Sequence, residues 1–313
     1  MADDFYRQLL AWSSNNILAV GLEKSVYLWD ATTGLVDCLA KGREEVASLT
    51  FDPAGHYLAV GNMVGDVDIW DLDGQTCIRQ LRSHSRTGIL TWSHSLLSTG
   101  CSDGSIVHLD VRLASYRVAQ TFAHSDQICG LVWHNNEVQL ASGGNDNLVF
   151  LWDMRSICTP IARFTGVHRA AVKAIAWCPW QANLLATGGG LNDGTLQFWD
   201  TTRGKLLYSI ETDSQVSSII WSRERREFLT AHGFPRNQLA LWHYPSLHKH
   251  GEIPAHESRV LHTAVSPSGQ VVATCAADEN LKFWHVFKPS PTLPKKNKAA
   301  IKRNVFNMQN SIR

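Results

Sequence analysis

Histidines are the side chains in this sequence that could most readily support chemistry, because imidazole titrates near neutral pH and binds metals. The chain holds 14 histidines, and four of them precede an aspartate by 19 to 25 residues. These pairs are His84 with Asp103, His124 with Asp146, His168 with Asp193, and His256 with Asp278. His248 and His250 could share one face of a strand, but no third ligand lies nearby. We therefore predict no metal and no other cofactor.

Two further stretches resemble ligand-binding loops only superficially. Gly188–Gly190 looks like a phosphate loop, yet a β-turn and a strand follow it in place of the helix N-terminus that a phosphate needs. Residues 223–227, Arg-Glu-Arg-Arg-Glu, mix charges of both signs, which is typical of a solvated turn. The cysteines and histidines show no spacing typical of a catalytic pair. We predict that the protein is not an enzyme.

A repeat sets the elements that position these residues. An apolar or aromatic residue followed by a polar one closes a β-rich run seven times, at Trp29-Asp30, Trp70-Asp71, Leu109-Asp110, Trp152-Asp153, Trp199-Asp200, Trp242-His243 and Trp284-His285. The intervals of 41, 39, 43, 47, 43 and 42 residues match a four-stranded blade of a WD propeller. The fifth interval, for example, contains short β-rich runs at 172–177, 184–187, 196–199 and 206–210. We predict an all-β, seven-bladed WD-repeat β-propeller.

In such propellers a histidine and an aspartate hydrogen-bond within one blade, so we expect the four His–Asp pairs to be structural. The propeller is expected to span residues 1–288, followed by a short flexible basic tether over residues 289–313. Few aromatic residues accompany the lysines of this tether, which favours a solvated segment over a nucleic-acid contact. Nuclear import remains an alternative use of the same lysines.

The bulk composition excludes several classes of protein. With 44% hydrophobic residues, 18% charged residues and a net charge of +1, the chain is neither disordered nor globally attracted to nucleic acid or membranes. No apolar run is long enough to cross a bilayer, and the N-terminus lacks a secretory signal. Seven scattered cysteines without a CxxC pair predict reduced, mostly buried thiols in an intracellular protein.

Several segments carry more information than the repeat alone: residues 4–6, 12–14, 26–29, 141–147, 171–181, 183–190, 214–216, 232–234, 259–261 and 277–279. The Trp-Cys-Pro-Trp-Gln stretch at 177–181 is the most specific, because generic WD repeats do not need it. With these segments the chain resembles the Fizzy family, the activators of the anaphase-promoting complex. The resemblance implies a substrate-recognition and activator subunit of this ubiquitin ligase, acting in mitotic or meiotic progression in the nucleus and cytoplasm.

The resemblance also implies partners and sites. Expected partners are core subunits of the ligase, cyclin- and securin-like substrates with degradation motifs, and checkpoint inhibitor proteins. The positions matching the family's site for the Lys-Glu-Asn motif are Asn145, Asn147, Gln215 and Arg259. Arginine suits the motif's glutamate, and the amides can both donate and accept. Alternatively, the two asparagines only shape a turn. Leu191 stands where the family usually has threonine.

The resemblance implies another site, between the first and last blades, for a second substrate motif, the destruction box (Arg-x-x-Leu). There the family uses two acidic residues for the motif's arginine; Glu279 matches one, but Ala11 replaces the other. Losing one carboxylate predicts destruction-box binding about tenfold to a hundredfold weaker. The final residues, Ile312 and Arg313, match the family's docking tail, which binds a core subunit of the ligase.

Two family features have no counterpart in the sequence. The N-terminal C-box, a second docking element, is missing, and few residues precede the first blade to supply the outer strand of the last one. We expect this strand to be short, absent, or replaced by residues 286–292. The chain could be a truncated activator, a short paralogue that does not activate the ligase, or a divergent WD scaffold with other partners.

Overall fold

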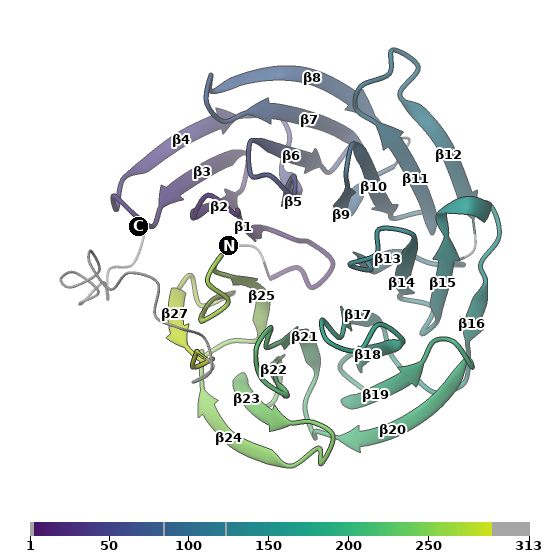
Figure 1. Ribbon diagram of the computed structural model, residues 1–313. Coiled ribbons are helices and arrows are strands. Elements are labelled where there is room, and N and C mark those ends of the chain that lie inside the picture. The colour runs from purple at the N-terminus through teal and green to yellow at the C-terminus, as the bar shows by residue number, and fades with distance from the viewer. Residues whose placement is uncertain (1–2, 84, 123, 290–313) are drawn as a thin grey trace.

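The computed structural model describes residues 3–83, 85–122 and 124–289. Seven antiparallel sheets are arranged in a ring, with their first strands around the centre (Figure 1). This confirms the predicted seven-bladed β-propeller. Within the described residues, the helical structure is limited to one 3-10 turn, η1 (Met154–Ser156).

The first three blades follow one another along the chain. The first contains β1 (Leu10–Trp12), β2 (Ile17–Leu22), β3 (Ser25–Asp30) and β4 (Val36–Lys41). The second contains β5 (Val46–Phe51), β6 (Tyr57–Asn62), β7 (Asp66–Asp71) and β8 (Thr76–Arg82). The third contains β9 (Thr87–Ser93), β10 (Leu96–Cys101), β11 (Ser105–Asp110) and β12 (Arg117–Phe122).

The remaining blades continue in the same order. The fourth contains β13 (Ile128–Trp133), β14 (Gln139–Gly144), β15 (Val149–Asp153) and β16 (Ala162–Phe164). The fifth contains β17 (Val172–Trp177), β18 (Leu184–Gly189), β19 (Thr195–Asp200) and β20 (Lys205–Glu211). The sixth contains β21 (Val216–Trp221), β22 (Glu227–His232), β23 (Gln238–His243) and β24 (Lys249–Pro254). The last contains β25 (Val260–Val265), β26 (Val271–Ala276) and β27 (Leu281–His285).

All seven predicted anchor dipeptides lie at the end of the third strand of a blade. The spacing identified the blades because each third strand pairs with the second strand of its blade, and its apolar residues pack against neighbouring blades. Neighbouring blades then share one apolar layer. Phe198 and Phe228, from the fifth and sixth blades, are fully buried and pack edge to face with centroids 5.4 Å apart.

The last blade is incomplete in the part of the chain that the structure describes, since β27 has no outer partner strand. Residues 286–289 are irregular, and 290–292 lie outside the described residues. Residues 3–9 do not supply the strand; they cross the ring instead (Figure 1). Phe5 packs with Cys129 and Ala171, and Gln8 forms a parallel bridge with Ser48. The expected gap in the last sheet is therefore present among these residues.

The histidine–aspartate pairs have the structural role predicted from sequence. In the fourth blade His124 Nδ1 lies 2.9 Å from Asp146 Oδ1, and its Nε2 lies 2.8 Å from Ser142 Oγ, which accepts from Trp152 Nε1 at 2.9 Å. Because a carboxylate only accepts, the imidazole proton lies on Nδ1. The fifth and last blades repeat this network around His168 and His256. His84 lies outside the described residues.

Candidate functional site

The predicted motif-binding residues come from loops at one end of the propeller. Asn145 and Asn147 lie in the turn between β14 and β15, while Gln215 and Arg259 immediately precede the first strands β21 and β25. In an antiparallel blade, the start of the first strand and the turn between the second and third strands lie at the same edge. The four residues therefore share one rim, which we call the upper rim.

Arg259 is held by the N-terminal segment that crosses the ring. Its Nε donates to Asp3 Oδ1 at 2.5 Å, and one terminal nitrogen donates to the Asp3 carbonyl oxygen at 3.0 Å. The arginine side chain keeps 26% of its surface exposed. The upper rim thus presents a guanidinium that binds a carboxylate and is still reachable from solvent.

Asn145 is oriented by the same segment. The Tyr6 hydroxyl donates to Asn145 Oδ1 at 2.8 Å, while Asn145 Nδ2 donates to Asp126 Oδ2 at 2.6 Å. Burial raises the pKa of the Tyr6 hydroxyl, and the negative charge of Asp126 raises it further, so Tyr6 stays a neutral donor. The segment from Asp3 to Tyr6 therefore links the Arg259 and Asn145 sides of the rim.

Gln215 lies beside Arg259 and carries an unused acceptor. Its side chain is 3% exposed, and its Oε1 has no hydrogen-bond partner among the residues that the structure describes. A Cβ added at Gly233 would collide with Gln215 Oε1 and lie 3.1 Å from Arg259 Cβ, which places the two side chains on either side of this glycine. A buried amide oxygen without a partner is costly, and it favours a ligand that can donate to it.

Asn147 has a clear local role. Its φ of 65° is left-handed, a conformation that asparagine tolerates better than most residues. The backbone of the turn therefore explains why asparagine occupies this position. The structure thus brings Gln215 next to Arg259 and links Asn145 to them through the N-terminal segment. Sequence reasoning missed Asp3 and Asp126 at this site, although Asp3 adjoins the segment 4–6 and Asp126 lies two residues after His124.

The two positions matched to the destruction-box site lie in different blades. Glu279 is exposed in the turn between β26 and β27, with a left-handed φ of 62°. Ala11, on β1, packs against the apolar cluster of the first two blades. Aromatic rings fill the junction of the first and last blades, where the Phe283 centroid lies 5.8 Å from that of Trp12 and 4.9 Å from that of Trp29. Ile312 and Arg313 lie outside the described residues.

The turn at residues 100–104 contains a sequence pattern that is typical of hydrolases. Gly100-Cys101-Ser102-Asp103-Gly104 fits Gly-x-Ser-x-Gly, but it forms a turn between two antiparallel strands rather than a strand-to-helix elbow. Ser102 Oγ lies 2.7 Å from Ser85 Oγ. Across the described ranges, no three His, Cys, Asp or Glu side chains are arranged to hold a metal ion. The same ranges contain no helix that is long and apolar enough to cross a membrane.

The seven cysteines form no disulfide within the described residues. Cys101, Cys129, Cys178 and Cys275 are buried, whereas Cys38, Cys77 and Cys158 are exposed. Burial raises the pKa of Cys129 and of Cys275 to about 12. These two thiols stay protonated and unreactive at neutral pH.

Comparison with known proteins identifies relatives of the whole propeller. The family model described as the CDC20/Fizzy WD40 domain matches residues 1–284. The chain is 47% identical to WD repeat-containing protein slp1 of Schizosaccharomyces pombe, covering 91% of this chain and 59% of that protein. It is 45% identical to the anaphase-promoting complex subunit cdc20 of Dictyostelium discoideum, covering 95% of this chain and 61% of that protein.

A solved structure agrees with these relatives. One chain in the crystal structure of a mitotic checkpoint complex superposes with a TM-score of 0.90 at 47% identity, covering 92% of both chains. The chain thus spans about three fifths of the length of the two relatives above. With the family model matched along the propeller and this level of identity, the chain belongs to the CDC20/Fizzy family of WD40-repeat proteins.

Proposed function

We propose that this chain is a substrate-recognition and activator subunit of the anaphase-promoting complex, and that its upper rim binds Lys-Glu-Asn motifs. The observation that carries the proposal is Arg259, which already binds a carboxylate, beside the unpaired buried oxygen of Gln215. Relatives described as subunits or cofactors of that complex support the assignment.

Each side chain of the motif has a complementary group on the rim. The motif's glutamate would take the Asp3 carboxylate's place on Arg259. The released Asp3, together with Asp126, would face the motif's lysine. The asparagine amide would donate to Gln215 Oε1 and so satisfy a buried acceptor. One cation, two carboxylates and one free acceptor thus match the three side chains in charge and hydrogen-bonding type.

The rest of the proposal concerns the whole protein. Ile312 and Arg313 would dock on a core subunit of the ligase, and destruction boxes would bind weakly near Glu279 because Ala11 supplies no carboxylate. Residues 289–313 would serve as the flexible basic tether. The protein would act as an adaptor without catalysis, in the nucleus and cytoplasm, on cyclin- and securin-like substrates, and would also bind checkpoint inhibitors. The mitotic checkpoint complex chain is a relative consistent with that last partner.

A peptide titration tests the motif site. A labelled Lys-Glu-Asn peptide should bind the wild-type chain and lose at least tenfold in affinity with Arg259→Ala, measured by fluorescence anisotropy. Arg203→Ala is the matched control, because Arg203 is 80% exposed in a turn of the opposite rim. Equal affinity for a peptide with three alanines in place of the motif would refute the site.

A pull-down tests docking. The ligase should be recovered with the full chain and lost when Ile312 and Arg313 are deleted. Equal recovery by both chains would remove the tail from the proposal. If neither the peptide nor the ligase binds a folded chain, a WD scaffold with other partners becomes the better assignment.

A further inference from the structure

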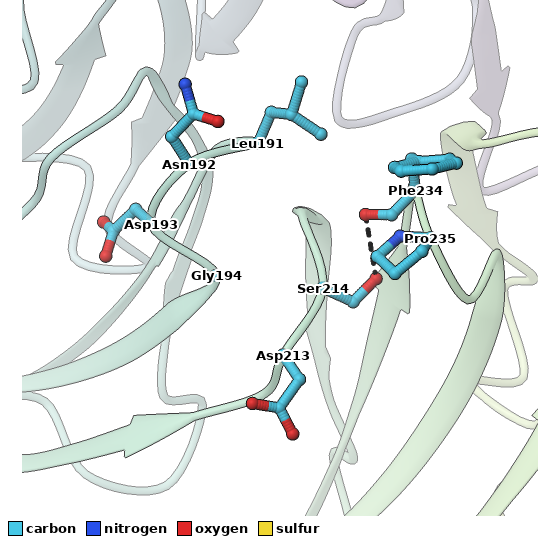
Figure 2. Close-up of a pocket in the computed structure, with 8 residues that line it drawn as sticks. All are labelled: Leu191, Asn192, Asp193, Gly194, Asp213, Ser214, Phe234 and Pro235. Carbon is cyan, nitrogen blue, oxygen red and sulfur yellow. Dashed lines mark hydrogen bonds between the residues drawn. The ribbon is translucent and has the colours of Figure 1, made fainter.

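A cavity of about 430 Å³ opens on the upper rim between the fifth and sixth blades. Figure 2 shows the residues around it, which include Leu191, Asn192, Asp213, Ser214, Phe234 and Pro235. Leu191 and Asn192 lie in the turn between β18 and β19, and Phe234 and Pro235 lie in the turn between β22 and β23. Asp213 and Ser214 belong to the connection between the two blades, so the cavity has walls from three loops.

Two walls are apolar and exposed. Leu191 is 54% exposed and Phe234 is 64% exposed, and they stand on the two blades that border the cavity (Figure 2). Backbone hydrogen bonds fix both turns. In the first, Asp193 N and Gly194 N donate to the Gly190 carbonyl oxygen at 3.1 and 3.0 Å. In the second, Asn237 N donates to the Gly233 carbonyl oxygen at 2.9 Å. The two side chains are therefore held apart with a space between them that one more apolar side chain could fill.

The cavity adjoins the Arg259–Gln215 site. Gln215 N donates to the Phe234 carbonyl oxygen at 3.2 Å, and Ser214 Oγ donates to that of Gly233 at 2.8 Å. Gly233 is also the residue that separates Gln215 from Arg259. A peptide bound on Arg259 and Gln215 would therefore reach the Phe234 wall within a few residues.

The charge of the cavity is acidic at its outer side. Asp193 is engaged, since its Oδ2 lies 2.6 Å from His168 Nδ1. Asp213 is available: its side chain is 75% exposed, and its only ion pair among the described residues is a long one, 3.8 Å to Arg236. A basic side chain placed after an apolar one would meet this carboxylate.

We propose that Leu191 and Phe234 form a subsite for an apolar residue that flanks the Lys-Glu-Asn motif, with Asp213 favouring a basic residue beyond it. The occupant is a substrate peptide continuous with the motif, and the inference rests on the proposed function. The subsite would let this chain select among motif-bearing substrates by the sequence around the motif.

The test uses a set of Lys-Glu-Asn peptides with four flanking positions on each side of the motif. In each peptide one flanking position is leucine and all the other flanking positions are serine. At one position or more, leucine should raise the affinity of the wild-type chain about tenfold. Leu191→Ser and Phe234→Ser should each remove this gain and leave the all-serine peptide unchanged. Leu113→Ser, a 49% exposed leucine in a turn of the opposite rim, is the control and should keep the gain.

The outcomes separate this inference from the proposed function. The subsite would be overturned, and the motif site would stand, if binding depended on the motif but no leucine improved it. The same would follow if the affinity gain from leucine persisted in both Leu191→Ser and Phe234→Ser. If the affinity were unchanged when alanines replace the motif, both the subsite and the motif site would be overturned. A concentration-dependent dimer that Phe234→Ser abolishes in sedimentation would also overturn the subsite, since a second copy would then be the occupant. Adding arginine beyond the leucine should gain a further twofold to fivefold that Asp213→Asn removes.

Discussion

The fourth and last blades contain the same hydrogen-bond network but differ in how they are closed. In both, the network's aspartate adjoins a candidate site residue: Asp146 lies between Asn145 and Asn147, and Asp278 precedes Glu279. The fourth blade has its outer strand β16 and a Trp152 that is 2% exposed, whereas β27 has no outer partner among the described residues and the corresponding Trp284 is only partly buried. A network that supports the fold thus also positions the rim, with a stiffer support in the fourth blade.

Removing the aspartate should give the largest effect and the clearest contrast. Asp146→Ala leaves His124 Nδ1 and the Ser125 and Leu148 amides without their acceptor, which should lower the free energy of unfolding by about 3 to 5 kcal/mol. It should also weaken Lys-Glu-Asn peptide binding, because Asn145 is adjacent. Asp278→Ala should cost about 1 to 3 kcal/mol, because a sheet with no outer strand among the described residues can rearrange to let water bind the amides that lose their acceptor. Urea denaturation of both variants measures the difference, and equal losses would contradict it.

Part of the pH dependence of stability should come from buried histidines outside the histidine–aspartate pairs. Burial lowers the pKa of His108 and of His232 to about 4. The unfolded chain takes up a proton on each below about pH 6.5 while the folded chain does not, so the free energy of unfolding should fall as the pH falls from 6.5 towards 4. At pH 5 the loss should be about 2 kcal/mol for each histidine.

Denaturation between pH 8 and 5 checks this slope. His232→Gln should flatten it, because glutamine does not titrate and can still hydrogen-bond Thr230 Oγ. The network aspartates act at lower pH: burial alone would raise the pKa of Asp146, but hydrogen bonds from His124 and backbone amides outweigh it and lower the pKa. That contribution to stability is present above the unfolded pKa of about 4 and is lost in more acidic solution.

The junction beside the last blade can be tested by restoring its missing acid. Ala11→Asp should raise the affinity for an Arg-x-x-Leu peptide about tenfold, with Glu279 as the second acceptor. Glu279→Gln in the same background should reverse the gain. An unchanged affinity would mean that position 11 serves the apolar cluster of the first two blades, against which Ala11 packs, and not the junction with the last blade.

The parts of this molecule that repeat were predictable from sequence, and the parts that occur once were not. The anchors from Trp29 to Trp284 predicted the blades because each depends on local pairing and burial repeated at a regular interval. The contacts of Asp3 with Arg259 and of Tyr6 with Asn145 join residues that only the closed ring brings together. No periodic pattern predicts the path of a segment that crosses the centre once.

The smallest expected effect concerns the link between this segment and the fourth blade. Tyr6→Phe removes one hydroxyl, which donates to Asn145 Oδ1 at 2.8 Å, while Phe5 and the rest of the segment keep their packing. Because water can reach the half-buried asparagine, the lost hydrogen bond should weaken Lys-Glu-Asn peptide binding only twofold to fivefold. The same change should leave destruction-box binding unaffected, since Glu279 lies in the last blade. A loss as large as that of Arg259→Ala would instead make Tyr6 a direct contact of the motif.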